Sequence, residues 1–200
     1  MSKTKEIVVD FRRNKPRVEP LVINGEPVEI VDHYKYLGTL IDNQLDWSPN
    51  ADMVCKKGNQ RLFFLRKLRQ FHVSPQILRL FYQSTIQSVL SFNQLCYHSS
   101  AKTTDMDQLE RVVSKAASIV GEELVPVSTW FTGAARKKLS KIQKDDRHPL
   151  HQVLASQESR REASRVLRSF NARTNRLRDS FLPTAVRLFN EQRHKPNVKK

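Results

Sequence analysis

Two short motifs carry residue types that can bind a metal ion. Cys96 and His98 are separated by one residue, and His148 and His151 by two. Thiolates and imidazoles are the ligands that zinc prefers, but structural zinc sites usually combine two cysteines a few residues apart with two histidines a few residues apart. The motifs here fit neither pattern, and Cys96 follows an apolar stretch, where a free cysteine commonly packs as a small hydrophobic side chain. We therefore expect no metal and no other cofactor.

The carboxylates of the sequence also suggest structure rather than catalysis. The only adjacent aspartates, Asp145 and Asp146, follow a helical pattern within Lys-Asp-Asp-Arg, and we interpret them as a turn and a cap for the next helix. Asp42 and Asp46 are interpreted as turn residues. A cysteine–histidine nucleophile lacks a third group to orient it, and the 5 glycines are too scattered for a phosphate-binding loop. No catalytic residue is predicted.

Charge is the strongest functional signal in the composition. The chain has 35 Lys and Arg residues against 20 Asp and Glu, which gives a net charge of +15 and a pI of about 10.2. Such an excess is typical of proteins that bind nucleic acid. A basic membrane-surface protein is the competing explanation, but no strongly amphipathic cationic helix with exposed Trp or Leu stands out. We expect nucleic acid (RNA, DNA or a hybrid) as partner, and neither a membrane nor a small-molecule substrate.

The remaining composition indicates a reducing compartment. No apolar run approaches the ~18 residues of a transmembrane helix, and polar residues after Met1 argue against a secretory signal. The 2 cysteines, Cys55 and Cys96, cannot form a disulfide framework. We expect the nucleus or the cytoplasm, whereas the oligomeric state is not predictable.

One long helix is predicted after Ser48-Pro49, an N-cap followed by proline at the first helical position. Its apolar side carries Val54, Gly58, Leu62, Leu65 and Leu68, and its polar side carries Lys56, Asn59, Gln60, Arg66, Lys67 and Gln70. Phe63 falls among the polar residues and is expected to be exposed. Between 48 and 71 there are six Lys or Arg residues against one Asp, which favours a surface that follows phosphates. The alternative is a merely solvated basic face.

Tyr36-Leu37-Gly38 lies in an apolar run that is followed by an acidic turn and Trp47. This segment resembles the primer grip of reverse transcriptases, most closely those of non-LTR (LINE-type) retrotransposons. In that family a bent strand at this place holds the 3′ end of the primer. Residues 3–11 resemble the preceding strand of the family, and residues 170–181 resemble its C-terminal signature.

The resemblance implies three groups of residues that contact nucleic acid. They are Tyr36, Leu37 and Gly38 in the grip, Lys56, Lys57, Arg61, Arg66 and Lys67 in a thumb-like helix, and Arg173, Arg176 and Arg178 near the C-terminus. From the residues alone, Gly38 could equally mark a bulge that only shapes the sheet. The family's aromatic-Ala-Asp-Asp motif, which supplies carboxylates for the two catalytic metal ions, occurs nowhere in the sequence.

Polymerase activity is therefore not expected of this chain. Three interpretations stay open: a sequence-tolerant nucleic-acid-binding remnant, an enzyme fragment that works only when the missing palm is supplied, and a non-functional relic of a decayed element.

A second resemblance covers Asp32 to Leu68, especially Lys57-Gly-Asn-Gln-Arg-Leu-Phe-Phe-Leu-Arg-Lys-Leu68. The stretch is similar to a short N-terminal segment of AlkB-type alkylation-repair proteins that also carry a tRNA methyltransferase domain. The resemblance implies an iron-binding His-x-Asp…His set and a Gly-rich strand-to-helix turn, and this sequence has neither. The alternative function is thus an AlkB-homologue N-terminal-type protein without those two activities.

The hydrophobic periodicity predicts an α+β chain: a small antiparallel β-sheet, then a helical bundle, then a basic and partly disordered tail. Strands are expected at 6–11, 21–31 (a hairpin around Asn24-Gly25) and 34–41, the last with Gly38 in its interior. Helices are expected at 48–71, 76–92, 104–120, 128–142, shortly after 149, and at 183–190. The helix at 76–92 is apolar almost all round and should be buried.

Composition divides the chain into three predicted segments. Residues 1–47 are the end of a palm with the primer grip, residues 48–156 are a thumb-like helical domain, and residues 157–200 are a basic C-terminal segment. From Arg160 onward, twelve Lys or Arg residues oppose three Asp or Glu residues.

Overall fold

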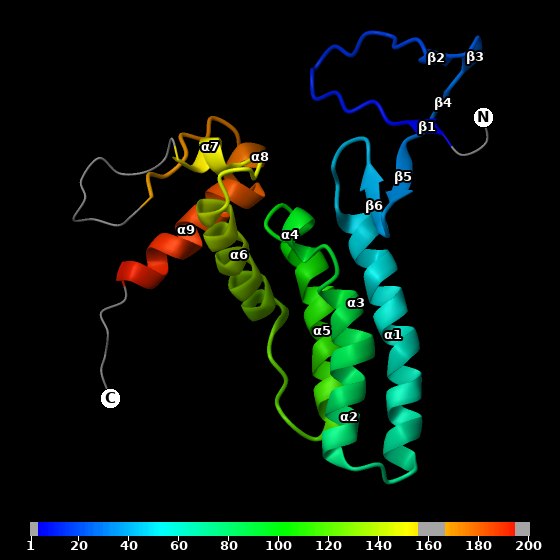
Figure 1. Ribbon diagram of the computed structural model, residues 1–200. Helices are drawn as coiled ribbons and strands as arrows, with labels where there is room; N and C mark the ends of the chain where they lie inside the picture. Colours follow the sequence, from blue (N-terminus) through cyan, green and yellow to red (C-terminus); the bar gives the residue numbers. More distant parts are fainter. Residues whose placement is uncertain (1–3, 156–166, 195–200) are drawn as a thin grey trace. The chain divides into compact units, whose positions relative to one another are not determined.

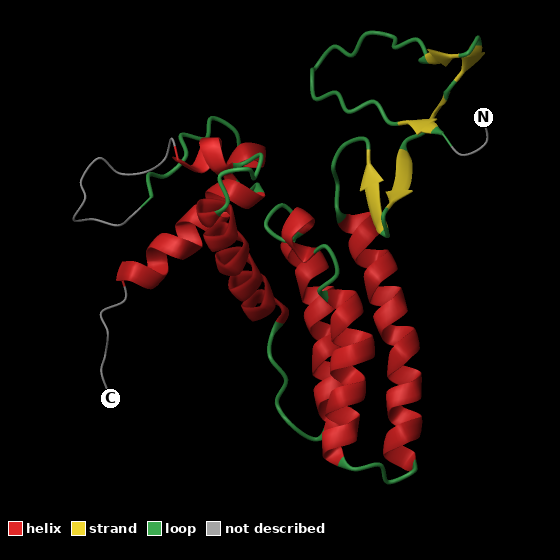
Figure 2. Ribbon diagram, viewed as in Figure 1, coloured by secondary structure: helices red, strands yellow, loops and turns green. Residues whose placement is uncertain are grey.

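The chain forms two compact units in the computed structural model, which describes residues 4–155 and 167–194 (Figure 1). Unit 1 consists of Met1–Leu90 and Ala101–Glu122, and unit 2 consists of Ser91–Ser100 and Glu123–Lys200. The fold is mixed α+β and mostly helical, with small strands in the N-terminal part, which confirms the predicted class (Figure 2). The three compositional segments stay a prediction. The boundary at 156/157 lies outside the described residues, and so do residues 157–166 and 195–200 of the predicted tail.

The N-terminal part contains three two-stranded sheets. Strand β1 (Lys5–Glu6) pairs in parallel with β4 (Glu29–Ile30), and β2 (Val22–Ile23) pairs antiparallel with β3 (Glu26–Pro27). Positive φ angles at Asn24 and Gly25 close the second pair, which confirms the predicted hairpin turn. The strand predicted at 6–11 is paired only over β1, so the β region is smaller than the periodicity suggests.

The segment from His33 to Asp42 is a hairpin rather than one continuous strand. Strand β5 (His33–Tyr36) pairs antiparallel with β6 (Thr39–Asp42), and Tyr36 faces Thr39 across the end of the ladder. Leu37 and Gly38 form the two-residue turn, with φ angles of 45° and 87°. Positive φ at both central residues is what the common two-residue hairpin turn requires. The expectation of a bulge at Gly38 inside a strand is therefore wrong.

Three helical stretches build the core of unit 1. They are α1 (Ser48–Gln70), α2 (Pro75–Phe81) with the π-helical η1 (Tyr82–Gln87) and α3 (Ser88–Leu90) continuing it, and α5 (Thr103–Val120). Their contact surfaces bury Leu62, Leu78, Ile86, Leu109 and Val112 almost completely. Gly58 lets three of these elements approach one another. A Cβ atom at this position would lie 3.1 Å from Leu90 Cδ2 on α3 and 3.1 Å from Val112 Cγ1 on α5.

The helix predicted at 76–92 differs from expectation in two ways. Its regular hydrogen bonding is interrupted by η1, where the Thr85 hydroxyl donates to the Phe81 carbonyl at 2.6 Å. Only one side is buried, since Ile77 and Leu80 are exposed apolar residues of α2. The prediction of a fully buried helix is therefore wrong, because the side away from α1 and α5 is not covered by the described part of unit 1.

Unit 2 is helical and has its own core. It contains α4 (Gln94–Tyr97), α6 (Val127–Lys144), α7 (His151–Ala155), α8 (Asn175–Arg178) and α9 (Phe181–His194). The buried stripe of α6 packs against α9, which contributes Val186 and Phe189 to the core. Arg136 Nε donates to the Leu188 carbonyl at 3.1 Å and ties the two helices together. No helix within 4–155 or 167–194 is both long and apolar enough to cross a membrane.

We expect Gly58→Leu to destabilise unit 1. The added side chain would have to displace Leu90 and Val112, and overpacking of this kind typically costs about 1–3 kcal/mol. Trp47 is the only tryptophan in unit 1 and Trp130 the only one in unit 2. Thermal unfolding followed by Trp47 fluorescence in a Trp130→Phe background measures the effect on unit 1.

Gly133→Leu is the matched control for this substitution. Gly133 is also helical, but a Cβ atom there would meet nothing within 4 Å. The leucine should leave stability unchanged or raise it, because glycine disfavours helix by about 1 kcal/mol. Equal unfolding temperatures for Gly58→Leu and the wild type would show that the close approach at Gly58 is not a constraint.

Candidate nucleic-acid interface

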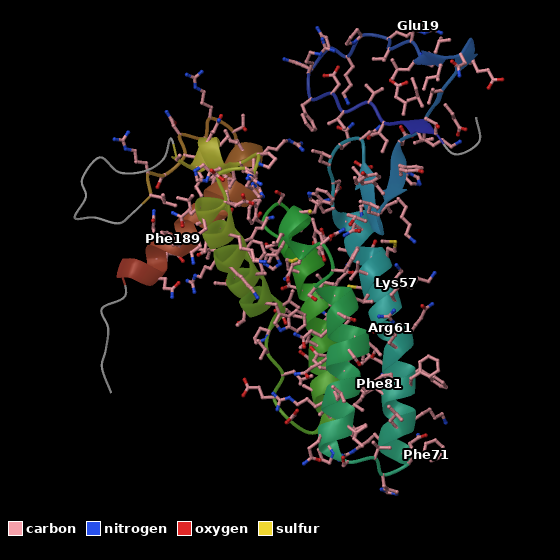
Figure 3. All side chains as sticks on the ribbon, viewed as in Figure 1. Glu19, Lys57, Arg61, Phe71, Phe81 and Phe189 are labelled. Carbon is pink, nitrogen blue, oxygen red and sulfur yellow. The ribbon has the colours of Figure 1, made fainter. Side chains whose placement is uncertain are left out.

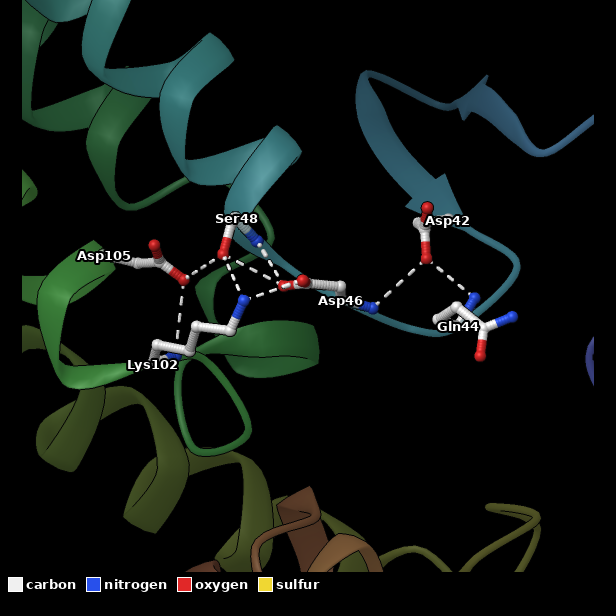
Figure 4. Close-up of polar contacts among 6 residues, drawn as sticks. All are labelled: Asp42, Gln44, Asp46, Ser48, Lys102 and Asp105. Atoms are coloured by element: carbon white, nitrogen blue, oxygen red, sulfur yellow. Dashed lines mark hydrogen bonds and ion pairs between the residues drawn. The ribbon is translucent and has the colours of Figure 1, made fainter. Parts of the chain in front are cut away.

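The amino-terminal end of α1 is fixed by a cluster of polar contacts (Figure 4). Asp46 Oδ1 accepts a hydrogen bond from the Ser48 backbone N–H at 3.0 Å, so Asp46 satisfies a free donor of the first turn. The prediction of Ser48 as the N-cap is wrong. Ser48 is the first helical residue, and Trp47 holds the cap position. The Ser48 hydroxyl lies 3.0 Å from Asp46 Oδ1 and 3.0 Å from Asp105 Oδ2.

Lys102 completes this cluster and connects it to α5. Its Nζ donates to Asp46 Oδ2 at 2.7 Å and to the Ser48 hydroxyl at 3.1 Å. A serine nucleophile would need a neutral lysine as base. The hydrogen bond to Asp46 instead raises the pKa of Lys102, and the same contact is the main cause of the lowered pKa of Asp46. The cluster therefore joins the starts of α1 and α5, and it does not supply a base.

Asp42 has the role of a turn residue, as predicted for both Asp42 and Asp46. Asp42 Oδ1 accepts from the Gln44 N–H at 2.7 Å and from the Asp46 N–H at 3.5 Å (Figure 4). The carboxylate thus holds the loop that leads from β6 into α1.

The outer surface of α1 carries a stripe of four exposed residues one turn apart. The stripe consists of Lys56, Gln60, Phe63 and Lys67, and we call it the outward stripe. Residues at i, i+4, i+7 and i+11 lie on one side of a helix. The buried residues Val54, Gly58, Leu62 and Leu65 occupy the opposite side. Phe63 is therefore exposed, as predicted from its position among polar residues.

The five cationic residues predicted on this helix do not share one environment. Lys56, Arg66 and Lys67 are exposed, whereas Lys57 and Arg61 are half-buried. Lys57 and Arg61 extend from α1 at successive turns (Figure 3). The Arg61 guanidinium donates to the Thr85 carbonyl of η1, which holds α1 against the neighbouring helix. Arg61 is thus engaged inside unit 1, and three of the five cations are exposed.

Tyr36 and Leu37, predicted as the primer grip, are exposed at the tip of the β5–β6 hairpin. The hairpin lies at the amino-terminal end of α1 (Figure 1), where the Leu40 N–H donates to Asn50 Oδ1 at 3.0 Å. The exposed cation Lys67 lies about 17 residues further along α1 than Asn50, or ~25 Å at the usual helical rise. The grip residues are thus nearest to the start of the outward stripe.

Unit 2 contains the three arginines predicted near the C-terminus. Arg178 pairs with Asp179 through two contacts of 2.8 Å, and this neighbour lowers the pKa of Asp179. Arg173 and Arg176 are exposed. A further cationic surface, not among the predicted sites, lies on α6, where Lys137, Lys141 and Lys144 are exposed at i, i+4 and i+7. The sequence signal for it is the basic run from Arg136 to Lys144, although cations also favour helix ends for electrostatic reasons.

The cysteine and histidine motifs have separate structural roles in unit 2. Cys96 is exposed, whereas the His98 ring stacks on Phe131 with centroids 4.1 Å apart. His151 Nδ1 contacts the Ile142 carbonyl at 2.9 Å. Within the described residues, no three His, Cys, Asp or Glu side chains gather as a metal site would require.

Comparison with known proteins gives one short match. Residues 47–88 match the family model described as "Alkylated DNA repair protein alkB homolog 8, N-terminal". The match covers α1, α2 and η1, about a fifth of the chain. No curated protein and no solved structure matches the chain. The comparisons thus support the AlkB resemblance for this helical segment, and they give no support to the resemblance to reverse transcriptases.

We expect unit 2 to lose stability as the pH falls below about 6.5, because of His98. Burial lowers the pKa of His98 from 6.5 to about 4, so the ring is neutral in the folded chain. Between these values the unfolded chain binds the proton more readily, and stability is lost as the pH falls. The loss should be roughly 2 kcal/mol, less than the full shift implies, because the ring is partly accessible.

The measurement is chemical unfolding from pH 7 to pH 4, followed by Trp130 fluorescence in a Trp47→Phe background. His98→Phe keeps an aromatic ring against Phe131 and cannot titrate, so it should reduce the pH dependence. The same slope in both proteins would assign the acid sensitivity to other groups.

Arg61→Ala should destabilise unit 1 by about 1–3 kcal/mol, because it removes a charged donor and leaves the Thr85 carbonyl with one partner fewer. Arg66→Ala, which removes an exposed cation from the same helix, should change stability by less than about 0.5 kcal/mol. Unfolding curves of the two variants in urea measure the difference. If both lose the same amount, Arg61 has no role in holding α1 to η1.

Proposed function

We propose that this chain binds nucleic acid through its phosphates, without base-sequence discrimination, and that it is not a catalyst on its own. The observation that carries the proposal is the set of exposed cations on α1. Lys56, Arg66 and Lys67 form no ion pair with any residue in 4–155 or 167–194. Cations that have no carboxylate partner can neutralise phosphates without first breaking an ion pair.

Unit 2 supports the same function with a larger charge. Its sequence holds 18 Lys or Arg residues and 7 Asp or Glu residues, so it contributes +11 of the total +15. The exposed lysines of α6 lie on a helix that contains no carboxylate. Two cationic helices in two units suit a long polyanion better than a single small anion.

The absence of catalysis is proposed from the sequence. The chain has no aromatic-Ala-Asp-Asp motif, no His-x-Asp pair and no Gly-rich phosphate loop. Among the described residues, Ser48 and Lys102 are the pair that most resembles a nucleophile and its base. Both side chains take part in the polar contacts at the starts of α1 and α5.

The family match makes an AlkB-homologue N-terminal-type protein a second candidate. The matched helices α1, α2 and η1 include the whole outward stripe. The name of the family refers to repair of alkylated DNA, so this candidate predicts tighter binding to an oligonucleotide with 1-methyladenine than to the unmodified one. Equal affinities for the two oligonucleotides would remove it.

Descent from a LINE-type reverse transcriptase, with the catalytic centre lost, stays a proposal that rests on the sequence resemblance alone. It predicts that an RNA–DNA primer–template is preferred over other duplexes, and that Tyr36→Ala weakens this preference. No preference among the duplexes would count against it.

The proposed function predicts a steep salt dependence of binding. We expect the affinity of the full chain for a fluorescent DNA duplex to fall linearly with salt on a log–log plot. The triple variant Lys56→Gln, Arg66→Gln and Lys67→Gln should reduce the slope by roughly 2–3, because each phosphate contact contributes about 0.9.

The matched control removes three exposed cations that already have carboxylate partners. Arg12 pairs with Asp10 at 2.7 Å, Arg17 with Glu19 at 3.3 Å and Arg79 with Glu122 at 3.4 Å. The triple glutamine variant of these arginines has the same net charge as the first variant and should keep the slope of the wild type. Equal losses in both variants would mean that net charge alone attracts the nucleic acid, and a flat wild-type slope would refute the proposed function.

A further inference from the structure

Phe63 occupies a place where a solvated helix surface would normally carry a polar residue. It lies in the outward stripe between Lys56 and Lys67, and 54% of its surface is exposed. Its neighbour Phe64 is 57% exposed. Neither ring contributes to the buried core of unit 1, so packing does not account for two adjacent phenylalanines here.

The rings and the adjacent cation form an ordered arrangement. The centroids of Phe63 and Phe64 are 5.5 Å apart with an interplanar angle of 81°, an edge-to-face contact that fixes the orientation of both rings. Lys67 Nζ lies over the Phe63 ring at 5.8 Å from its centroid. An exposed aromatic ring and an ammonium group are thus held together on one helix.

A single nucleotide offers the complementary pair of groups, a base with a flat π-face and a phosphate. At the usual helical rise, Lys56 lies ~10 Å before Phe63 along α1 and Lys67 lies ~6 Å after it. The flexible lysine side chains can therefore reach phosphates on both sides of one base that stacks on the ring.

We infer that the outward stripe of α1 binds single-stranded nucleic acid, with an unpaired base stacked on Phe63 and the flanking phosphates on Lys56 and Lys67. The inference rests on the proposed function and names its substrate class. In a duplex the bases already stack on one another, so Phe63 gains nothing from them. In a single strand every base has a free face, and stacking on aromatic residues is the common mode of sequence-tolerant binding.

Charge decides between this ligand and a protein partner. The cores of protein interfaces are depleted in lysine, whereas lysines lie on both sides of Phe63 in the stripe. Helix α1 has six Lys or Arg residues and a single Asp, so a partner must be strongly anionic. A protein partner would be an outcome of the test and not the expectation.

The test compares the full chain with Phe63→Leu on two labelled probes, an oligothymidylate and a DNA duplex of the same length. Leucine keeps the apolar volume and removes the ring. The wild type should prefer the single strand, and Phe63→Leu should weaken single-strand binding about fivefold or more and leave duplex binding unchanged. Because Phe63 is exposed, the variant should fold normally, which its unfolding curve verifies.

Phe92→Leu is the matched control. Phe92 is 49% exposed, but its segment Ser91–Ser100 contains no Lys or Arg, so this variant should bind both probes as the wild type does.

Equal losses of single-strand binding in Phe63→Leu and Phe92→Leu, or a preference of the wild type for the duplex, would overturn the inference and leave the proposed function intact. A change of oligomeric state in Phe63→Leu would also overturn it, because Phe63 would then serve a protein contact. If neither probe binds in a salt-dependent manner, the proposed function itself is refuted.

Discussion

The close approach of three helices at Gly58 determines which residues of unit 1 face solvent. Leu90 on α3 and Val112 on α5 would both lie 3.1 Å from a Cβ atom at this position, so α1 can rotate very little about its own axis. Leu62 and Leu65 are buried on the same side, one and two turns later. Once that side is fixed, Lys56, Phe63 and Lys67 must point away from the bundle. The cationic and aromatic surface is thus a consequence of helix packing on the other side.

The elements with strong local signals could be predicted from the sequence. Pro49 and a clear 3.6-residue period defined α1, Gly121 ended α5 with a φ angle of 86°, and Asn24-Gly25 closed a hairpin. Leu37-Gly38 carries a weaker signal, because leucine at positive φ costs roughly 1–2 kcal/mol and is rarely found there. The pairing of Tyr36 with Thr39 imposes this turn, and such pairing is a tertiary effect that a local pattern does not show.

The candidate interface was predictable only in part, for a similar reason. Lys56 and Lys67 follow from the period of α1, but Arg61 looks equivalent to them in the sequence and is instead bound to the Thr85 carbonyl. Likewise, Ile77 and Leu80 have the composition of core residues and lie exposed on α2. Whether a side of a helix is covered depends on which other elements exist, and composition within the helix does not contain that information.

The division of the chain has a consequence for its synthesis on the ribosome. Every residue of unit 1 has been translated once Glu122 is made, so this unit can fold while the rest of the chain is still growing. The segment Ser91–Ser100 is translated earlier than Ala101–Glu122, yet it belongs to unit 2, whose helices α6 and α9 are translated only after Glu122. Leu95, which packs against the core of unit 2 in the finished protein, must therefore wait in contact with water or a chaperone until its partners on α6 and α9 emerge.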